Sequence, residues 1–190
     1  MSLSEKFDQA LLHASRLHRQ QVRKTTRVPY VSHLLAVASL VLEHGGDEEE
    51  AIAALLHDAV EDQGGLPTLE QIRSLFGDRV ADIVRGCSDA WTQPKPPWLE
   101  RKRAYLEHLR TASRSVRLVA AADKLHNARS VLSDLLEIGD ALWERFNAGR
   151  DQQLWYYRAL ADTFRDCGPE DLARELERVV GEIEGRARQP

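Results

Sequence analysis

The sequence predicts an all-α protein, folded as a helical bundle of about eight to ten helices. Hydrophobic residues recur every three to four positions along most of the chain, which is the spacing of an amphipathic helix. The strand-like alternation of valine, isoleucine and aromatic residues is nearly absent. With 190 residues, the chain has the length of one domain that buries its own core. We therefore expect a single domain over residues 1–185 and a flexible tail at 186–190.

Capping residues and glycines set the expected ends of the first helices. Ser2 with Glu5 forms a capping-box pattern, which starts a helix that should run to about residue 19. A basic loop follows, and the next helix begins after Pro29 and ends at the glycine pair 45–46.

The middle of the chain shows three further helices. Asp47 can cap a helix over 48–60, whose apolar side chains form a buried stripe. Glycine and proline residues then interrupt the pattern, and Thr68 starts a short helix that stops at Gly77. Residues 79–88 form the third.

One irregular segment separates these helices from the rest. Residues 93–98 contain three prolines and are expected to form a loop that acts as a lid or as an interaction surface. Helices then resume over residues 99–110, 115–136, 141–146, 151–166 and 170–184.

Composition excludes several classes of protein. The net charge of −4 does not favour a nucleic-acid surface, which normally carries a basic excess. No apolar run approaches the roughly 18 residues that a membrane span needs, and the amino end has no apolar signal segment. The two cysteines, Cys87 and Cys167, are too few for a disulfide framework. A cytoplasmic location is therefore expected.

The pair His57-Asp58 carries the strongest chemical signal. It directly follows the apolar run 53–56, and burying two such polar side chains is costly unless something pairs with them. Glu61 and Asp62 follow at a spacing of four residues, which places them at the same end of a helix. A divalent cation would relieve the repulsion among these carboxylates.

Two further polar residues stand in apolar helices. Taken singly, His33 and Asp123 would more often be satisfied core residues than ligands. With His57 and Asp58 they complete two imidazoles and two carboxylates, which suits Mn²⁺, with Fe²⁺ and Zn²⁺ as alternatives. Such an ion predicts metal-assisted phosphoester hydrolysis, with Glu61 and Asp62 orienting or deprotonating the nucleophile.

These motifs resemble the HD-domain phosphohydrolase superfamily, and within it the hydrolase domain of RelA/SpoT proteins. The matching blocks, which span roughly residues 5 to 165, are Arg23-Lys24, Pro29-Tyr30 with His33, the run 54–62, Phe76-Gly77 and the run 122–129. The sequence carries no synthetase or regulatory segment, so it looks like a stand-alone small alarmone hydrolase.

The resemblance implies a role for each matching position. His33, His57, Asp58 and Asp123 would bind Mn²⁺, and Glu61-Asp62 would activate water for removal of the 3′-pyrophosphate from ppGpp or pppGpp. Asn127 would contact the nucleotide, and Arg23 and Lys24 would bind it. Asn127 also lies one helical turn beyond Asp123, so spacing alone places it on the metal-facing side.

Several alternatives stay open from the sequence. Hydrolases of adenine alarmones share this scaffold, so the base is not fixed. An HD nucleotidase acting on other nucleotides, or a nucleotide sensor without turnover, would keep much of the same pocket. Tyr156 is a candidate for stacking on a base, although such aromatic residues more commonly pack in a core. A homo-oligomer is possible, and no nucleic-acid or membrane partner is expected.

Overall fold

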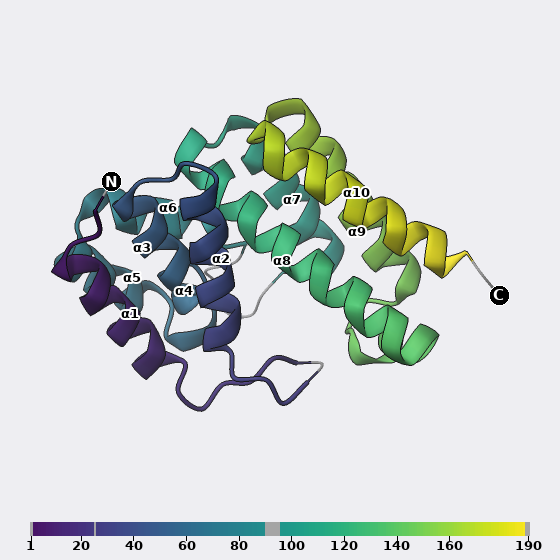
Figure 1. Ribbon diagram of the computed structural model, residues 1–190, viewed down its shortest axis with the longest axis horizontal. Coiled ribbons are helices and arrows are strands. Elements are labelled where there is room, and N and C mark those ends of the chain that lie inside the picture. The colour runs from purple at the N-terminus through teal and green to yellow at the C-terminus, as the bar shows by residue number, and fades with distance from the viewer. Residues whose placement is uncertain (1, 25, 90–95, 189–190) are drawn as a thin grey trace.

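The computed structural model describes residues 2–24, 26–89 and 96–188, and it confirms the all-α fold (Figure 1). Over these residues, the chain forms ten α-helices and one 3-10 helix, and a single β-bridge joins Val22 to Pro29. In chain order the helices are α1 (Glu5–Leu17), α2 (Val31–Glu43), α3 (Glu48–Leu56), α4 (Ala59–Gln63), α5 (Leu66–Phe76), α6 (Asp78–Cys87), α7 (Trp98–Thr111), α8 (Arg114–Ile138), η1 (Gly139–Arg145), α9 (Arg150–Cys167) and α10 (Glu170–Ala187).

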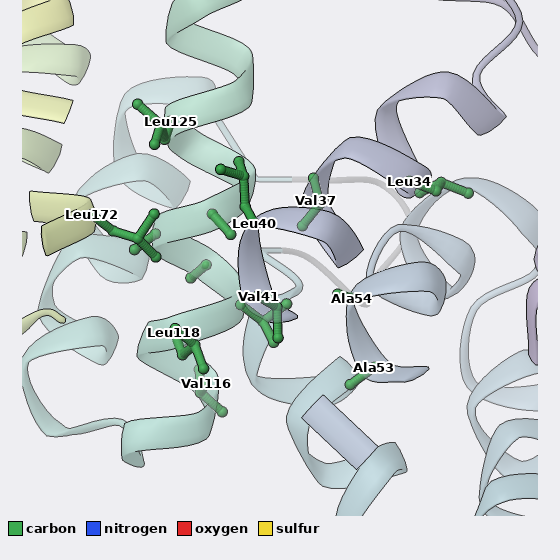
Figure 2. Close-up of a cluster of buried hydrophobic side chains, with 14 of the residues drawn as sticks. Leu34, Val37, Leu40, Val41, Ala53, Ala54, Val116, Leu118, Leu125 and Leu172 are labelled. Carbon is green, nitrogen blue, oxygen red and sulfur yellow. The ribbon is translucent and has the colours of Figure 1, made fainter. Parts of the chain in front are cut away.

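The long helix α8 is the centre of the bundle. It packs against α2, α3 and α6 on one side and against α9 and α10 on the other (Figure 1). Apolar side chains of α2 and α3 meet those of α8, and Leu172 of α10 approaches α8 from the opposite side (Figure 2). The three alanines at 120–122 are buried, and because their side chains are small, neighbouring helices can approach α8 closely at this point. Each buried leucine or valine here contributes about 1.5–3 kcal/mol.

Two predicted helix ends are confirmed by their capping contacts. Asp47 caps α3 in a complete capping box, because its carboxylate accepts from the Glu50 backbone N–H and the Glu50 carboxylate accepts from the Asp47 N–H. After α2, Gly45 adopts a positive φ of 76°, and the Gly46 N–H donates to the Val41 carbonyl at 2.8 Å. Glycine suits this left-handed position because it has no Cβ.

Three predicted helix boundaries and one predicted helix type are wrong. Helix α1 is capped by Ser4, whose hydroxyl accepts from the Lys6 N–H, so Ser2 lies outside it. Helix α5 begins at Leu66, and the Thr68 hydroxyl donates instead to the Gln63 carbonyl. The helix expected over 48–60 ends at Leu56 and restarts as α4. The segment expected as an α-helix at 141–146 is the tighter 3-10 helix η1.

The irregular segment and the predicted tail are described only in part. Residues 93–95 lie outside the described residues, and Pro96 and Pro97 immediately precede α7. Helix α10 continues to Ala187, past the start of the predicted tail at 186. None of the described helices is both long enough and apolar enough to span a lipid bilayer.

Candidate active site

The four predicted metal ligands come from three places in the fold. His33 lies in the first turn of α2, Asp123 lies within α8, and His57 and Asp58 form the junction between α3 and α4. His33, His57 and Asp123 are buried. Because α2, α3 and α8 pack on one another, residues far apart in the sequence meet at one point.

Both imidazoles turn their Nε2 atoms towards the carboxylates. The Asp58 Oδ2 atom lies 2.9 Å from His57 Nε2 and 3.4 Å from His33 Nε2. The Asp123 Oδ1 atom lies 3.3 Å from His33 Nε2 and 3.6 Å from His57 Nε2. Neither Nε2 atom has hydrogen-bond geometry to a partner. His33, His57 and Asp58 form a group that could hold a metal ion, and the Asp123 carboxylate adjoins it. Two imidazole nitrogens with carboxylate oxygens are donor types that suit a divalent cation.

The other ring nitrogen of each histidine is already bound. The His57 Nδ1 atom lies 2.8 Å from the Ala54 carbonyl oxygen, so it donates its hydrogen there. The His33 Nδ1 atom lies 2.8 Å from His126 Nδ1. A proton on each Nδ1 leaves the Nε2 lone pair free for a cation, which is how metal-binding histidines are usually held.

Charges in the cluster reinforce one another. Burial opposes ionisation of Asp58 and Asp123, but His57 beside Asp58, and Lys124 beside Asp123, hold the pKa of each carboxyl well below its usual range. Burial would likewise lower the pKa of His57, but Asp58 and Asp123 outweigh it and raise that pKa well above its usual value. Without a cation His57 therefore also carries a proton on Nε2, which a bound cation would displace. Both carboxylates are therefore anionic and suited to a cation.

A cleft of about 230 Å³ opens beside this cluster. Its lining residues are Gln21, Val22, Arg23, Lys24, Tyr30, Asp58, Glu61, Asp62, Asn127, Ser130, Val131, Asp134, Phe146 and Tyr157. The predicted catalytic pair Glu61 and Asp62 and the predicted substrate-binding residues Arg23, Lys24 and Asn127 thus share one cleft with a predicted metal ligand.

Hydrogen bonds fix several of these side chains. The Asn127 amide donates to Asp123 Oδ1 at 2.5 Å, and its Oδ1 atom accepts from Arg23 at 2.9 Å. The Tyr30 hydroxyl donates to Asp58 Oδ2 at 2.6 Å. Burial and the Asp58 charge raise the pKa of Tyr30 far above its usual value, so this phenol stays a donor. Arg23 and Asn127, which are predicted to bind substrate, are therefore linked by hydrogen bonds to Asp123, a predicted metal ligand.

Asp62 is held by a residue that the sequence analysis missed. The Gln21 amide donates to Asp62 Oδ2 at 2.7 Å, and the Gln63 amide donates to Gln21 Oε1 at 2.6 Å. The His18 Nδ1 atom lies 2.7 Å from the same Gln21 oxygen. No sequence spacing identifies Gln21, because its contact joins the loop before α2 to α4. The contacts leave Asp62 in one orientation at the cleft.

The structure places Tyr156 outside the cleft and its neighbour Tyr157 in the cleft wall. Tyr156 is buried beneath α7, where its ring lies 5.8 Å from that of Trp98 and 4.8 Å from the Lys102 ammonium. The periodicity of α9 could not decide which of the two adjacent tyrosines faces the cleft, because it does not tell which face of α9 meets α8. Tyr156 therefore packs against α7, and Tyr157 joins Tyr30 and Phe146 as an aromatic residue of the cleft wall.

Comparison with known proteins agrees with this geometry. A family model described as "HD domain" matches residues 10–151, which is most of the chain. The chain belongs to the HD-domain family. Histidine and aspartate side chains, the residue types expected for a divalent metal centre in an HD-domain protein, meet where α2, α3 and α8 pack together.

Named relatives extend the match. A guanosine-3′,5′-bis(diphosphate) 3′-pyrophosphohydrolase, MESH1, of Xenopus tropicalis is 42% identical over 121 residues, covering 62% of this chain and 65% of that protein. The Drosophila melanogaster MESH1 is 37% identical over 131 residues, covering 67% and 70%. The chain thus matches slightly less than two thirds of the frog protein's length.

A solved structure matches almost the whole chain. It is described as a metazoan ortholog of SpoT that hydrolyses ppGpp, and it superposes with a TM-score of 0.78 at 28% identity, covering 96% of this chain and 98% of that one. The resemblance to the RelA/SpoT hydrolase domain is confirmed.

Proposed function

We propose that this protein removes the 3′-pyrophosphate from alarmone nucleotides such as (p)ppGpp or (p)ppApp, releasing pyrophosphate and GDP or GTP, or the adenine equivalent. The observation that carries the proposal is one cleft, beside a candidate metal cluster, in which the carboxylates of Glu61 and Asp62 and the basic pair Arg23-Lys24 lie together. The relatives named above bear the same activity in their names.

The ligands of the cation would be His33, His57, Asp58 and Asp123. We propose Mn²⁺, with Fe²⁺ and Zn²⁺ as alternatives, since imidazole and carboxylate together suit these ions. When bound, the cation would polarise the phosphate and lower the pKa of water.

The chain's own residues would do the remaining work. Arg23 and Lys24 would bind the phosphates, and the contact of Arg23 with Asn127 would align the nucleotide with Asp123. Asp62, held by Gln21, and Glu61 would accept the proton of the attacking water.

The bond changes are those of a simple hydrolysis. Water attacks the phosphorus that is esterified to the 3′ oxygen, and the bond between that phosphorus and the 3′ oxygen breaks. The 3′ oxygen leaves with a proton, and one water is consumed for each pyrophosphate released. The few cysteines fit a reducing compartment, so we also propose that the reaction takes place in the cytoplasm.

The test is a hydrolysis assay with Mn²⁺ on ppGpp, ppApp, GTP and GDP, with products separated by ion-exchange chromatography. We expect pyrophosphate from an alarmone, its loss in Glu61→Gln and Asp58→Ala, and normal activity in Glu70→Gln, an exposed control on α5. Release of single phosphates would instead indicate a general nucleotidase. Tight binding without turnover in metal-loaded protein would indicate a sensor, and undiminished activity in the Glu61→Gln and Asp58→Ala variants would refute the site.

A further inference from the structure

The cleft follows one face of α8. Asp123, Asn127, Val131 and Asp134 are spaced by three or four residues, so they lie on one face of this helix. Asn127, Val131 and Asp134 line the cleft. Asp123 and Asp134 are about 16 Å apart along the helix axis at 1.5 Å per residue. The cleft therefore runs along α8 from the side of the candidate metal cluster to a carboxylate about three turns away.

Part of the cleft wall is apolar. Val131 of α8, Phe146 beyond η1 and Tyr157 of α9 line it. Tyr157 is buried, which raises the pKa of its phenol to about 12, so it is a neutral aromatic surface. An aromatic base is the part of a nucleotide that suits such walls.

Among the cleft-lining residues from α8 to α9, Asp134 is the one acidic group, and it is half-buried. Among the residues that the structure describes, no hydrogen bond or ion pair reaches its carboxylate. A free carboxylate in a cleft for an anionic ligand repels the phosphates, unless it meets a part of the ligand that donates hydrogen bonds. The neighbouring Ser130 does not supply such a hydrogen bond to Asp134, because its hydroxyl donates to the His126 carbonyl at 3.1 Å.

We propose that Asp134 recognises the base of the substrate and selects guanine over adenine. This inference rests on the proposed alarmone hydrolysis and names the base for that same site. The Watson–Crick edge of guanine offers two parallel donors, N1–H and the N2 amino group, which match the two oxygens of a carboxylate. Adenine offers one donor, its N6 amino group, beside N1, which is a hydrogen-bond acceptor and would face the acceptor oxygen of the carboxylate.

The experiment compares kcat/KM for ppGpp, ppApp and the hypoxanthine analogue, which lacks the N2 amino group. Wild type should prefer ppGpp, with the hypoxanthine analogue between the two. In Asp134→Asn, kcat/KM for ppGpp should fall about tenfold or more through KM, while kcat changes little. Activity on ppApp should be unchanged or higher, because the amide can also donate to N1. Glu137→Gln, an exposed carboxylate on the same helix, is the matched control.

Three results would overturn the assignment. Equal losses of kcat/KM on all three substrates would show that Asp134 contacts the ribose and not the base. An unchanged ratio of kcat/KM for ppGpp and ppApp would show that Asp134 has no role in base selection. A preference of the wild type for ppApp would contradict the hydrogen-bond argument. Asp134→Ala, checked by thermal unfolding, covers the case in which the first variant does not fold. Calorimetric binding of GDP and ADP to wild type and variant tests base selection without turnover, so the proposal is tested even if no alarmone is hydrolysed.

Discussion

His126 provides the sharpest test of how the candidate metal centre is held. Burial, reinforced by the nearby His33 and Arg23, lowers the pKa of His126 to about 4, so this ring is neutral at pH 7. A neutral ring has one nitrogen that accepts a hydrogen bond, and here Nδ1 is the atom that meets His33 Nδ1. We expect this contact to keep the proton of His33 on Nδ1 and so to leave Nε2 able to bind a cation.

The size of the effect follows from burial. His33 is fully buried, so in His126→Phe its Nδ1–H would lose the one acceptor seen in the described residues. Leaving a buried donor unsatisfied costs about 1–3 kcal/mol, which the ring avoids by moving the proton to Nε2. The proton must then be displaced before a cation binds. We expect Mn²⁺ to bind about 10- to 100-fold more weakly, the range found when such supporting residues are changed in other metal sites.

Titration of metal-free protein with Mn²⁺, followed by electron paramagnetic resonance, measures this affinity directly. His126→Asn should retain much of the affinity, because its amide oxygen can occupy the place of Nδ1 and accept the same hydrogen bond. His108→Phe removes a histidine on α7 that bonds the Gly86 carbonyl, away from the cluster, and should leave the affinity unchanged. Wild-type affinity in a folded His126→Phe protein would refute the reasoning.

Three further predictions concern stability, each measured by urea unfolding. Phe164→Ala should lose about 3–5 kcal/mol, because the Phe164 ring is fully buried; a loss under 1 kcal/mol would contradict the packing described. Gly86→Ala should be destabilising because its Cβ would lie 2.5 Å from a Val116 methyl, and Val116→Ala in the same chain should recover part of the loss, whereas strictly additive effects would argue against this contact. The hydrogen bond from Arg79, followed by backbone N–H donors, lowers the pKa of Asp47, so its charge should stabilise the fold above the unfolded-state pKa of about 4 and cease to do so as pH falls through the lower folded-state value. Asp47→Asn keeps an oxygen that can cap the helix but loses the charge that pairs with Arg79. Its loss of unfolding free energy should be under about 1 kcal/mol, because the pair is half-exposed, and should vanish at low pH. A loss that persists at low pH would assign the effect to the cap.

The local helix signals in this sequence were informative where a single residue decides the outcome. Asp47 caps α3 and Gly45 ends α2 because each acts through its own backbone neighbours. The break after Leu56 was not predictable in this way. The pattern of apolar residues continues through it, and the requirement that His57 and Asp58 face the same cluster is a tertiary one.

The sequence by itself determined the helical class and the family resemblance, and it led to the proposed cation ligands. Those follow from periodicity and from polar side chains placed where burial would otherwise be costly. Only the tertiary structure decided the contacts between distant segments: Gln21 on Asp62, His126 on His33, and Tyr157 instead of Tyr156 in the cleft wall. Helical spacing tells which residues share a face, but the packing of α8 against α2 and α9 decides what each face meets.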